Sequence, residues 1–323
     1  TETARRYREI SVTDIRVSSE QQRDLALQFG MIPYCGTFSP RGRHGQVMSP
    51  EEEAHFAYIN GHDLKHLEAK ERNAIVNRRR IERNHRFGGE PVAGMDTLNS
   101  ARIACFNSDV DHELGKQALD KICAKVPGVK GIYFDYIGYS NFKGCYCDTC
   151  RADYRKFLKE NSWPDTPHHQ DVFYRKMLVD YYNAMVDYVK ETHPDFTVVA
   201  HIYPVFLPEP LYGNRTRVDF CGQTVAWYFP WSPQKIDDYT RVTVEQATRH
   251  FDHVRGVPFV GLNRRPGSLW SKPPATLERE LRAILAAGGR MAMVCNGSDM
   301  LNPEIAPIFR KLGPAGDPAA STR

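Results

Sequence analysis

A (β/α)8 barrel (TIM barrel), in which parallel strands alternate with helices, is the α/β fold class that the sequence predicts. From about residue 100 onward, short β-branched or aromatic runs alternate with amphipathic helical patterns and polar loops. Strands that alternate with helices of this length form parallel βα units. The runner-up, an open doubly wound sheet, is disfavoured because the sequence has no glycine-rich phosphate-binding loop.

The expected elements follow one another in the order that a barrel requires. Strands are expected over residues 31–38, 101–108, 129–137, 195–204, 218–229, 257–263 and 290–298. Helices are expected over residues 111–126, 150–162, 170–193, 232–254 and 275–289, and the last of these ends in two glycines, a common stop. The first barrel strand is harder to place. Residues 9–17 are a poor candidate, so this strand is expected to be irregular or to lie outside the sequence.

A single barrel domain over residues 1–312 is expected, followed by a disordered tail at 313–323. A polar, mostly helical insertion at about 40–100 interrupts the alternation. As part of a βα connection it would lie at the C-terminal face of the barrel and roof the active site. Its basic part, residues 72–86, is interpreted as a solvated helical face rather than a nucleic-acid contact.

The composition is that of a soluble globular protein, with 41% hydrophobic and 25% charged residues. A formal charge of +4 over 323 residues is too small to predict nucleic-acid binding. No run approaches the roughly 20 apolar residues of a membrane span, and the polar start "TETARRYREI" does not resemble a signal peptide. We therefore expect a cytoplasmic protein that binds a small-molecule or oligosaccharide substrate and neither nucleic acid nor membrane. The oligomeric state is left open, a homo-oligomer included.

Three cysteines within six residues predict a metal site. Cys145, Cys147 and Cys150 form a C-x-C-x-x-C motif between a strand end and a helix start, and eight cysteines are too few for a disulfide scaffold. Cys105, at the end of the preceding strand, is the expected fourth ligand. Four cysteines close a tetrahedral zinc site, so the zinc would be structural. The alternative is a group of reduced, unliganded thiols. The remaining cysteines are interpreted as buried small apolar residues: Cys35, Cys123, Cys221 and Cys295.

These motifs resemble those of known glycoside hydrolases. The stretch "ACFNS" followed by "GCYCDTCRADYRKFL" is similar to family 42 β-galactosidases, which carry a Cys-Pro-Asn-Ser motif and a Cys-Tyr-Cys-x-x-Cys cluster that binds structural zinc. "GIYFD" and "SLWSKPPATLERELRAILAAGGRM" resemble a group of hypothetical glycosyl hydrolases allied to the family 29 and 151 α-L-fucosidases. The resemblance covers roughly residues 100–312. Neither the Asn-Glu pair nor the nucleophilic Glu of family 42 is present.

Asp135 is the candidate catalytic carboxylate. An ionised side chain directly after the apolar run "GIYF" should face the open mouth of the barrel, where functional groups gather. The fucosidase-like resemblance implies a nucleophile here, at the end of a fourth strand. A capping or arginine-paired Asp is the alternative. Glycoside hydrolysis usually needs a second carboxyl group. Glu209 is the expected acid/base, with Asp299, Asp109 and Asp111 as rivals.

Other residues at expected strand ends offer hydrogen bonds or an aromatic platform for a sugar. The candidate substrate-binding residues are Asn107, Tyr136, His201, Trp227, Tyr228, Asn263, Arg264, Asn296 and Asp299. His201 is equally well interpreted as a hydrogen-bonded core residue. Trp231 is a second stacking candidate. Arg264 and Arg265 would hold a substrate carboxylate or neutralise Asp135.

Three functions are consistent with these residues. The first is a glycoside hydrolase with Asp135 as nucleophile or electrostatic stabiliser. The second is a lyase or isomerase that acts on an acidic sugar or natural product in the same barrel mouth, which Arg264 and Arg265 favour. The third is a barrel that binds carbohydrate without catalysis. Fold analogy does not choose among them.

Overall fold

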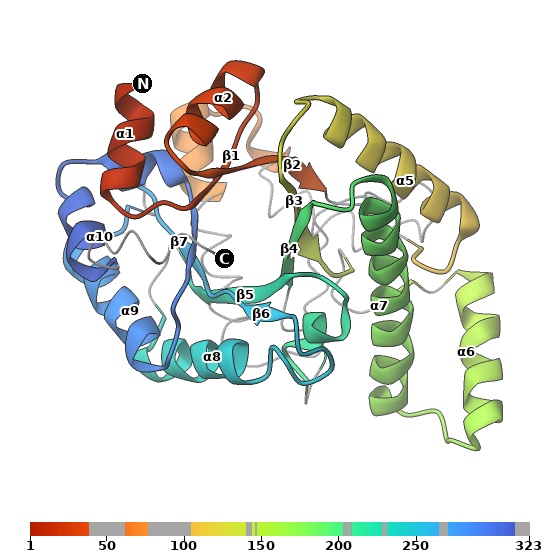
Figure 1. Ribbon diagram of the computed structural model, residues 1–323. Helices are drawn as coiled ribbons and strands as arrows, with labels where there is room; N and C mark the ends of the chain where they lie inside the picture. The colour runs from red at the N-terminus through yellow and green to blue at the C-terminus, as the bar shows by residue number, and fades with distance from the viewer. Residues whose placement is uncertain are drawn as a thin grey trace.

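The strands form one curved parallel sheet with helices on its outer side (Figure 1). The computed structural model describes residues 1–38, 62–76, 105–139, 144–145, 147–202, 206, 209–227, 231–264 and 271–313. The strands are β1 (Asp14–Arg16), β2 (Ile32–Phe38), β3 (Gly131–Ile137), β4 (Thr197–Ile202), β5 (Phe220–Ala226), β6 (Arg255–Gly256), β7 (Phe259–Gly261) and β8 (Met293–Cys295). Their order in the sheet is β1-β2-β3-β4-β5-β7-β8, with β6 paired to β5. This arrangement confirms the predicted barrel fold with an irregular edge.

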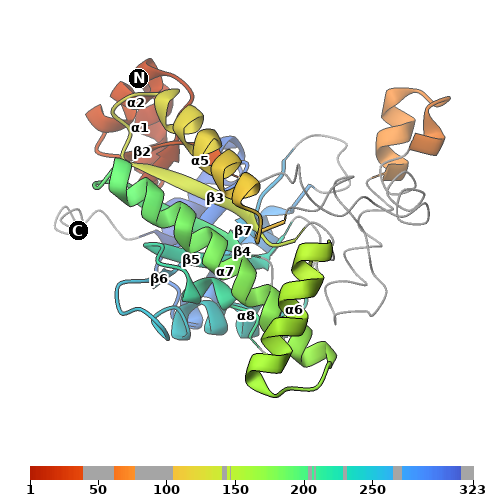
Figure 2. The ribbon, with the colours of Figure 1, turned by 90° about the vertical axis from the view of Figure 1, so that its right-hand side faces the viewer.

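Helices between the strands cover the convex face of the sheet, as Figure 2 shows for α5 and α7. The α-helices are α1 (Glu2–Glu9), α2 (Glu20–Gln28), α5 (Asp109–Ala124), α6 (Asp148–Asn161), α7 (Pro167–Thr192), α8 (Pro233–Glu245), α9 (Pro274–Ala286) and α10 (Ala306–Leu312). The short 3-10 helices are η1 (His62–Leu64), η2 (Tyr212–Arg215) and η3 (Gly297–Leu301). Four α-helices begin after an N-cap residue whose side-chain hydroxyl accepts a hydrogen bond from a backbone N–H of the first turn. These N-cap residues are Ser19 for α2, Ser108 for α5, Thr166 for α7 and Ser232 for α8.

The sheet differs from the predicted one between β2 and β3. Strand β2 pairs directly with β3, with Tyr34 opposite Gly131, so no strand lies between them. The prediction of a sheet strand over 101–108 is wrong for residues 105–108, which precede α5 without strand structure, and residues 101–104 lie outside the described residues. Asp135 consequently belongs to the third strand of the sheet and not to a fourth. The first strand, β1, is only three residues long and lies within residues 9–17, the stretch judged a poor candidate for it.

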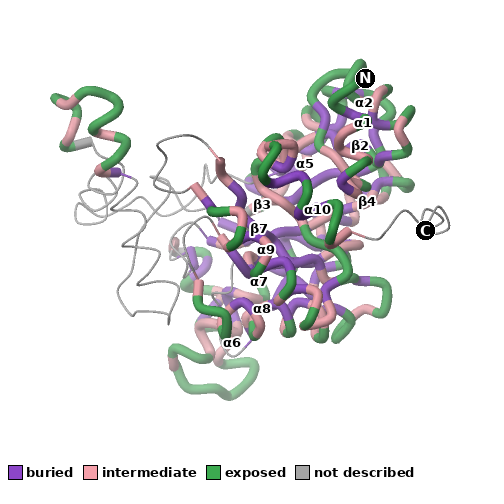
Figure 3. Tube along the Cα trace, turned by 90° about the vertical axis from the view of Figure 1, so that its left-hand side faces the viewer, coloured by how far each residue is buried: buried purple, intermediate pink, exposed green. Residues whose placement is uncertain are grey.

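The sheet has an apolar inner face that is separate from its contacts with the helices. Tyr133, Val257 and Phe259 form this inner cluster, and Val199, Phe220 and Met293 pack against it. The six side chains come from strands or from the turn before β7, and none comes from a helix. The larger clusters lie between the sheet and the surrounding helices, where the chain is mostly buried (Figure 3). Of the four cysteines predicted to be buried, Cys35, Cys123 and Cys221 are buried and Cys295 is partly exposed.

Gly222 allows the inner face to close, and its replacement by Ala should destabilise the protein. A Cβ atom at Gly222 would lie 1.9 Å from the Val257 carbonyl oxygen and 2.7 Å from the Phe259 ring. Backbone must move to accept it, so we expect Gly222→Ala to lower the free energy of unfolding by about 1–3 kcal/mol or more in urea denaturation. Gly297→Ala is the matched control, because nothing lies within 4 Å of its added Cβ. Equal stability of the two variants would contradict this close approach.

The N-terminal helix covers the irregular edge of the sheet. Arg6 of α1 donates a hydrogen bond from its Nη2 to the Leu301 carbonyl oxygen at 2.7 Å, and Glu9 lies 3.8 Å from Arg310 of α10. Tyr7 and Val12 pack against the cluster built from β7, α9 and α10. Among the described residues, β8 and β1, the two edge strands of the sheet, are not paired by hydrogen bonds. The contacts of the N-terminal segment with Leu301, Arg310 and the cluster of β7, α9 and α10 connect the two edges instead. None of the described helices combines the length and apolar character that crossing a bilayer requires.

Candidate active site and cysteine cluster

Polar side chains follow the inner apolar cluster on four strands of the sheet. Side chains two or four residues apart on a strand share one face of a sheet. Asp135 follows Tyr133 by two residues and His201 follows Val199 by two, while Thr224 follows Phe220 by four. Cys295 likewise follows Met293 by two residues on β8. A polar layer therefore lies on the inner face, toward the carboxyl ends of β3, β4, β5 and β8.

Asp135, His201 and Thr224 are joined by a chain of hydrogen bonds. The Oδ1 atom of Asp135 lies 3.0 Å from His201 Nδ1, and His201 Nε2 lies 2.9 Å from Thr224 Oγ1. The Tyr133 hydroxyl also donates to Asp135 Oδ1, at 3.2 Å. Because an ionised carboxylate only accepts, the proton belongs on His201 Nδ1, and in the neutral imidazole Nε2 then accepts from Thr224. The chain orients the carboxylate from two neighbouring strands.

The two ends of this chain of hydrogen bonds are partly exposed, and its middle is buried. The Asp135 side chain is 40% exposed, whereas that of His201 is 5% exposed, and Thr224 is partly exposed. A threonine nucleophile activated by His201 and Asp135 would have a buried acid. The accessible carboxylate of Asp135 argues against that arrangement and makes Asp135 a group that a ligand can reach. His201 is the residue that positions it.

Aromatic packing holds His201 in place. Its ring stacks on Phe259, with the centroids 4.4 Å apart and the planes at 20°, and Phe259 in turn stacks on Tyr133. Next to this stack, burial and the nearby charge of Asp135 raise the pKa of the Cys295 thiol to about 12. Cys295 is accordingly a protonated thiol at neutral pH and not a thiolate nucleophile.

The four predicted metal ligands form one compact cluster. The Sγ atoms of Cys105, Cys145, Cys147 and Cys150 all lie within 4.8 Å of one another. Cys105 Sγ lies 3.8 Å from Cys147 Sγ and 3.5 Å from Cys150 Sγ. Thiolates at about 2.3 Å from a tetrahedral zinc lie about 3.8 Å apart, so these spacings suit a four-thiolate metal site. The cluster confirms that Cys105 joins the other three.

The protonation of the cluster favours metal binding. Hydrogen bonds from the thiols of Cys105 and Cys150 lower the pKa of Cys145 to about 2. The same interaction with Cys145 raises the pKa of Cys105 to about 12 and is among the causes that raise the pKa of Cys150. A metal would displace the protons held by Cys105 and Cys150 and bind the Cys145 thiolate directly.

Neighbouring residues fix the backbone on both sides of the cysteine cluster. The Cys105 backbone N–H donates to the buried Asp111 carboxylate at 3.0 Å, and Cys147 is the N-cap of α6. The Asn107 side chain donates to Asp153 of α6. Asn107 and Asp111 therefore support the cluster. The rival Asp109 lies exposed in the first turn of α5.

Glu209 does not join the Asp135 site in the described structure. Its carboxylate is buried and is bound by Arg215 Nε at 2.8 and 2.9 Å, Arg175 Nη1 at 3.2 Å and His250 Nε2 at 3.3 Å. These partners belong to η2, α7 and the segment after α8, in the outer layer of the fold. The structure therefore separates the two carboxylates that the sequence analysis paired.

The remaining predicted residues are dispersed. Arg264 forms an ion pair with Glu304 and donates to the Lys272 carbonyl oxygen, while Asp299 accepts the Arg264 backbone N–H at 3.0 Å. Trp227 and Asn263 are partly exposed after β5 and β7, and Asn296 is exposed after β8 in a left-handed conformation with φ of 64°. Tyr228 and Arg265 lie outside the described residues, and so does the side chain of Tyr136.

Sequence reasoning missed two members of the inner polar layer. Thr224 was passed over because "GQT" weakens the strand pattern of β5, and Cys295 was interpreted as a core residue. The alternation itself contains the missing signal, because Thr224 follows Gly222 and Phe220 at the spacing of one strand face.

The fold and site define the protein as an α/β protein with a barrel-like parallel sheet and a polar layer at its strand ends. No family model and no curated protein matches the sequence. The family 42 and fucosidase resemblances thus remain without a family match.

Solved structures match the fold. The PgaB (BpsB) glycoside hydrolase domain from Bordetella bronchiseptica is 11% identical with a TM-score of 0.54, covering 98% of this chain and 93% of that one. The β-galactosidase from Bacillus circulans sp. alkalophilus is 13% identical with a TM-score of 0.54, and the match covers 97% of this chain and 52% of the β-galactosidase chain. A β-galactosidase from the haloarchaeon Halorubrum lacusprofundi is 12% identical with a TM-score of 0.50, covering 91% and 50%. At this identity the likeness shows the fold alone, and this chain spans about half the length of each β-galactosidase.

Proposed function

We propose that the protein is a glycoside hydrolase that uses Asp135 at the barrel mouth. One observation carries the proposal: the partly exposed Asp135 carboxylate is oriented by a buried histidine that is itself fixed by Thr224 and Phe259. A rigidly held carboxylate at strand ends suits the charge that develops at an anomeric carbon. The glycoside hydrolase structures that share the fold support the same class.

In this proposal Asp135 acts at the sugar carbon and His201 acts on Asp135. As a nucleophile, the carboxylate would form a bond to the anomeric carbon while the bond to the leaving oxygen breaks and that oxygen takes a proton. As a stabiliser, it would balance the positive charge of the oxocarbenium-like carbon. The His201 N–H favours the ionised carboxylate in both roles. The proton would come from a second carboxylic acid, which is neither of the described partners of Asp135, Tyr133 and His201.

The test is turnover of a panel of aryl glycosides, with the α-L-fucoside and β-D-galactoside included. We expect Asp135→Asn to lower kcat by on the order of 10³-fold, because it removes the reacting charge and keeps the shape. His201→Gln should lower kcat less and leave KM nearly unchanged, since this residue only positions Asp135. Both variants should unfold at a temperature within a few degrees of the wild-type midpoint, as measured by circular dichroism.

Glu209→Gln is the control for the second carboxyl group. Its place in the outer layer predicts that kcat changes by less than about twofold in the folded variant, whereas an acid/base role predicts a loss on the order of 10²-fold or more. If folded wild-type protein turns over none of the panel, the hydrolase proposal fails and a barrel that only binds carbohydrate becomes the better reading. The lyase or isomerase alternative loses its support at Arg264, which is already paired with Glu304.

We propose further that the four-cysteine cluster holds a structural zinc ion. Cys105, Cys145, Cys147 and Cys150 would supply all four ligands, which leaves no open position for a reacting group. Zinc would supply cross-linking and charge neutralisation there, and no chemistry on a substrate. Its location supports this role, because it ties the segment before α5 to the start of α6, next to the strand that carries Asp135.

A further inference from the structure

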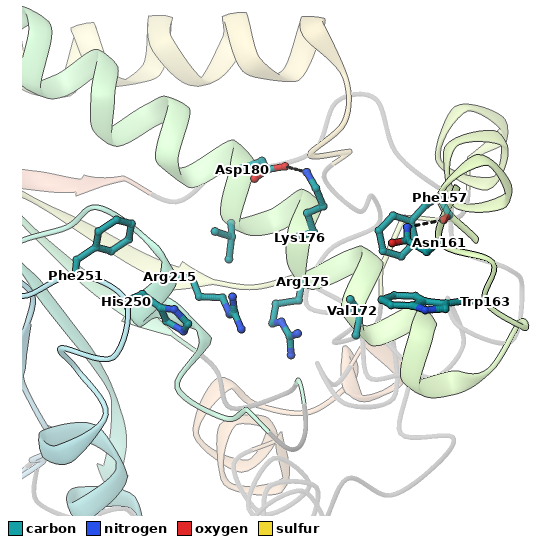
Figure 4. Close-up of a pocket in the computed structure, with 11 residues that line it drawn as sticks. Phe157, Asn161, Trp163, Val172, Arg175, Lys176, Asp180, Arg215, His250 and Phe251 are labelled. Carbon is teal, nitrogen blue, oxygen red and sulfur yellow. Dashed lines mark hydrogen bonds and ion pairs between the residues drawn. The ribbon is translucent and has the colours of Figure 1, made fainter. Parts of the chain in front are cut away.

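A groove outside the barrel contains charged groups that the Asp135 site does not use. It has a volume of about 540 Å³ and lies among α6, α7, η2 and the segment after α8 (Figure 4). Figure 4 shows Arg175, Arg215 and His250 directed into one space, with Trp163 at its far end. Its volume falls in the range of small-molecule sites, about 300–1,000 Å³.

The cationic end of the groove gathers more basic side chains than acids that are ion-paired to them. Arg175, Arg215 and His250 share one carboxylate, that of Glu209. Lys176 and Asp180, on the same helix, neutralise each other in an ion pair. Asp171, one turn before Arg175, forms no ion pair with it among the described contacts, but its charge acts on Arg175. Arg215 is the more exposed of the two guanidinium groups and has Glu209 as its one described ion-pair partner.

The geometry of the shared carboxylate directs hydrogen-bond donors into the groove. Arg215 uses only its Nε to hold both Glu209 oxygens, so among the described residues its two terminal amino groups have no hydrogen-bond partner. The Arg215 side chain is 39% exposed, while Arg175 is 13% exposed and is bound to Glu209 through Nη1 alone. Burial lowers the pKa of Arg175, and Glu209 opposes this. Two preorganised guanidinium edges thus suit a planar anion such as a carboxylate.

The other end of the groove has an aromatic wall. Trp163 is 38% exposed, and its ring is held by stacking on His169 at 4.6 Å and by an edge contact with Phe157 at 5.6 Å. Phe251 lies beside His250 at the cationic end. A rigid, partly exposed indole at the opposite end of the groove from two guanidinium groups fits a ligand that has both an apolar ring face and, further along its length, a carboxylate.

We propose that this groove binds a saccharide that carries carboxylate groups, such as a uronic-acid chain. Arg175 and Arg215 hold one sugar carboxylate, with Glu209 fixing their orientation from behind, and Trp163 packs against the apolar face of a neighbouring sugar ring. Glu209 is a positioning residue in this site. The proposal does not depend on catalysis at Asp135.

The test is binding of tetragalacturonate to full-length protein carrying Asp135→Asn, which prevents turnover at the barrel mouth. Tryptophan fluorescence is the readout. We expect tetragalacturonate to change the fluorescence saturably and neutral maltotetraose not to. Arg215→Gln should weaken binding by about tenfold or more, because it removes a charge-assisted contact. Trp163→Phe should remove the fluorescence change.

Arg217→Gln is the matched control, because Arg217 lies two residues from Arg215, is 43% exposed and is paired with Asp187 outside the groove. The affinity of the Arg217→Gln variant for tetragalacturonate should equal that of the parent protein that carries only Asp135→Asn. Equal binding by the Arg215→Gln variant, or no binding by the parent, would overturn the proposal. Sodium sulfate that binds as tightly as tetragalacturonate would also overturn it, since the saccharide would then contribute nothing.

Discussion

Removal of metal from the four-cysteine cluster is expected to lower the Tm of the protein by roughly 6 °C. A ligand present at about 1,000 times its Kd stabilises the folded state by about 4.1 kcal/mol, and each kcal/mol shifts the Tm of a domain of this size by about 1.5 °C. The cluster joins the segment before α5, through Cys105, to the start of α6, through Cys147, across the intervening α5 and β3. Without a metal, the buried thiols of Cys105 and Cys150 lie beside the buried Cys145 and lower its pKa, and Cys147 is partly exposed.

The measurement combines metal content with thermal unfolding. Protein as purified should contain about one zinc per chain by elemental analysis, and a chelator should remove it and lower the Tm together. Cys147→Ser should give the lower Tm without chelator, because it removes one of the four ligands. Cys147 is the ligand to replace because it is the most accessible of the four, so the substitution disturbs the packing least. Cys221→Ala removes a buried thiol outside the cluster and should keep both the zinc and the response to chelator. A Tm that does not respond to chelation of a zinc-loaded protein would contradict a structural role.

The fold could be predicted because its signals are local. The strands β4 and β7 belong to mostly apolar runs bounded by turns, and α7 and α9 have helical periodicity with Pro at their first turns. The strand predicted over 101–108 failed because Cys105 and Phe106 are apolar and buried for a different reason, namely the cysteine cluster and the aromatic packing beside it. Burial by a metal site and burial in a sheet produce the same apolar pattern.

The site could be predicted only where one residue carries its own signal. Asp135 is an acid within an apolar strand, and the C-x-C-x-x-C spacing is specific, so both were found. Glu209 has the same local context as a strand-end acid, but its role depends on Arg175 and His250, which are 34 and 41 residues away in the sequence. Contacts between residues so far apart in the sequence leave no local pattern or spacing from which they could be predicted. Thr224 was missed for the related reason that a partner, His201, defines its role.

Breaking the buried pair of Lys272 and Glu280 is expected to destabilise the protein by about 3–5 kcal/mol. Lys272 Nζ lies 2.6 Å from Glu280 Oε2, and the two side chains are 2% and 1% exposed. Burial lowers the pKa of Lys272 and raises that of Glu280, and each is opposed by the charge of the other. Glu280→Gln therefore leaves a buried ammonium group without its counter-charge. The free energy of unfolding in urea is the quantity to measure.

The pair also anchors the segment that follows β7. The Lys272 backbone N–H donates to the Asn263 carbonyl oxygen at 2.9 Å, and the Lys272 carbonyl oxygen accepts from Arg264. Replacing both partners, as Lys272→Met with Glu280→Leu, removes both charges and should recover most of the loss, because buried apolar residues of similar volume replace an ion pair at little cost.

An exposed Glu–Lys ion pair is the control for the buried pair of Lys272 and Glu280. Glu160 lies 3.8 Å from Lys156 on α6, with side chains 60% and 72% exposed, so Glu160→Gln should change the free energy of unfolding by less than about 1 kcal/mol. A Glu280→Gln variant as stable as the Glu160→Gln variant would mean that water reaches Lys272. A double variant no more stable than Glu280→Gln would mean that the pair is needed for the shape of the loop between β7 and α9 and not only for its charge balance.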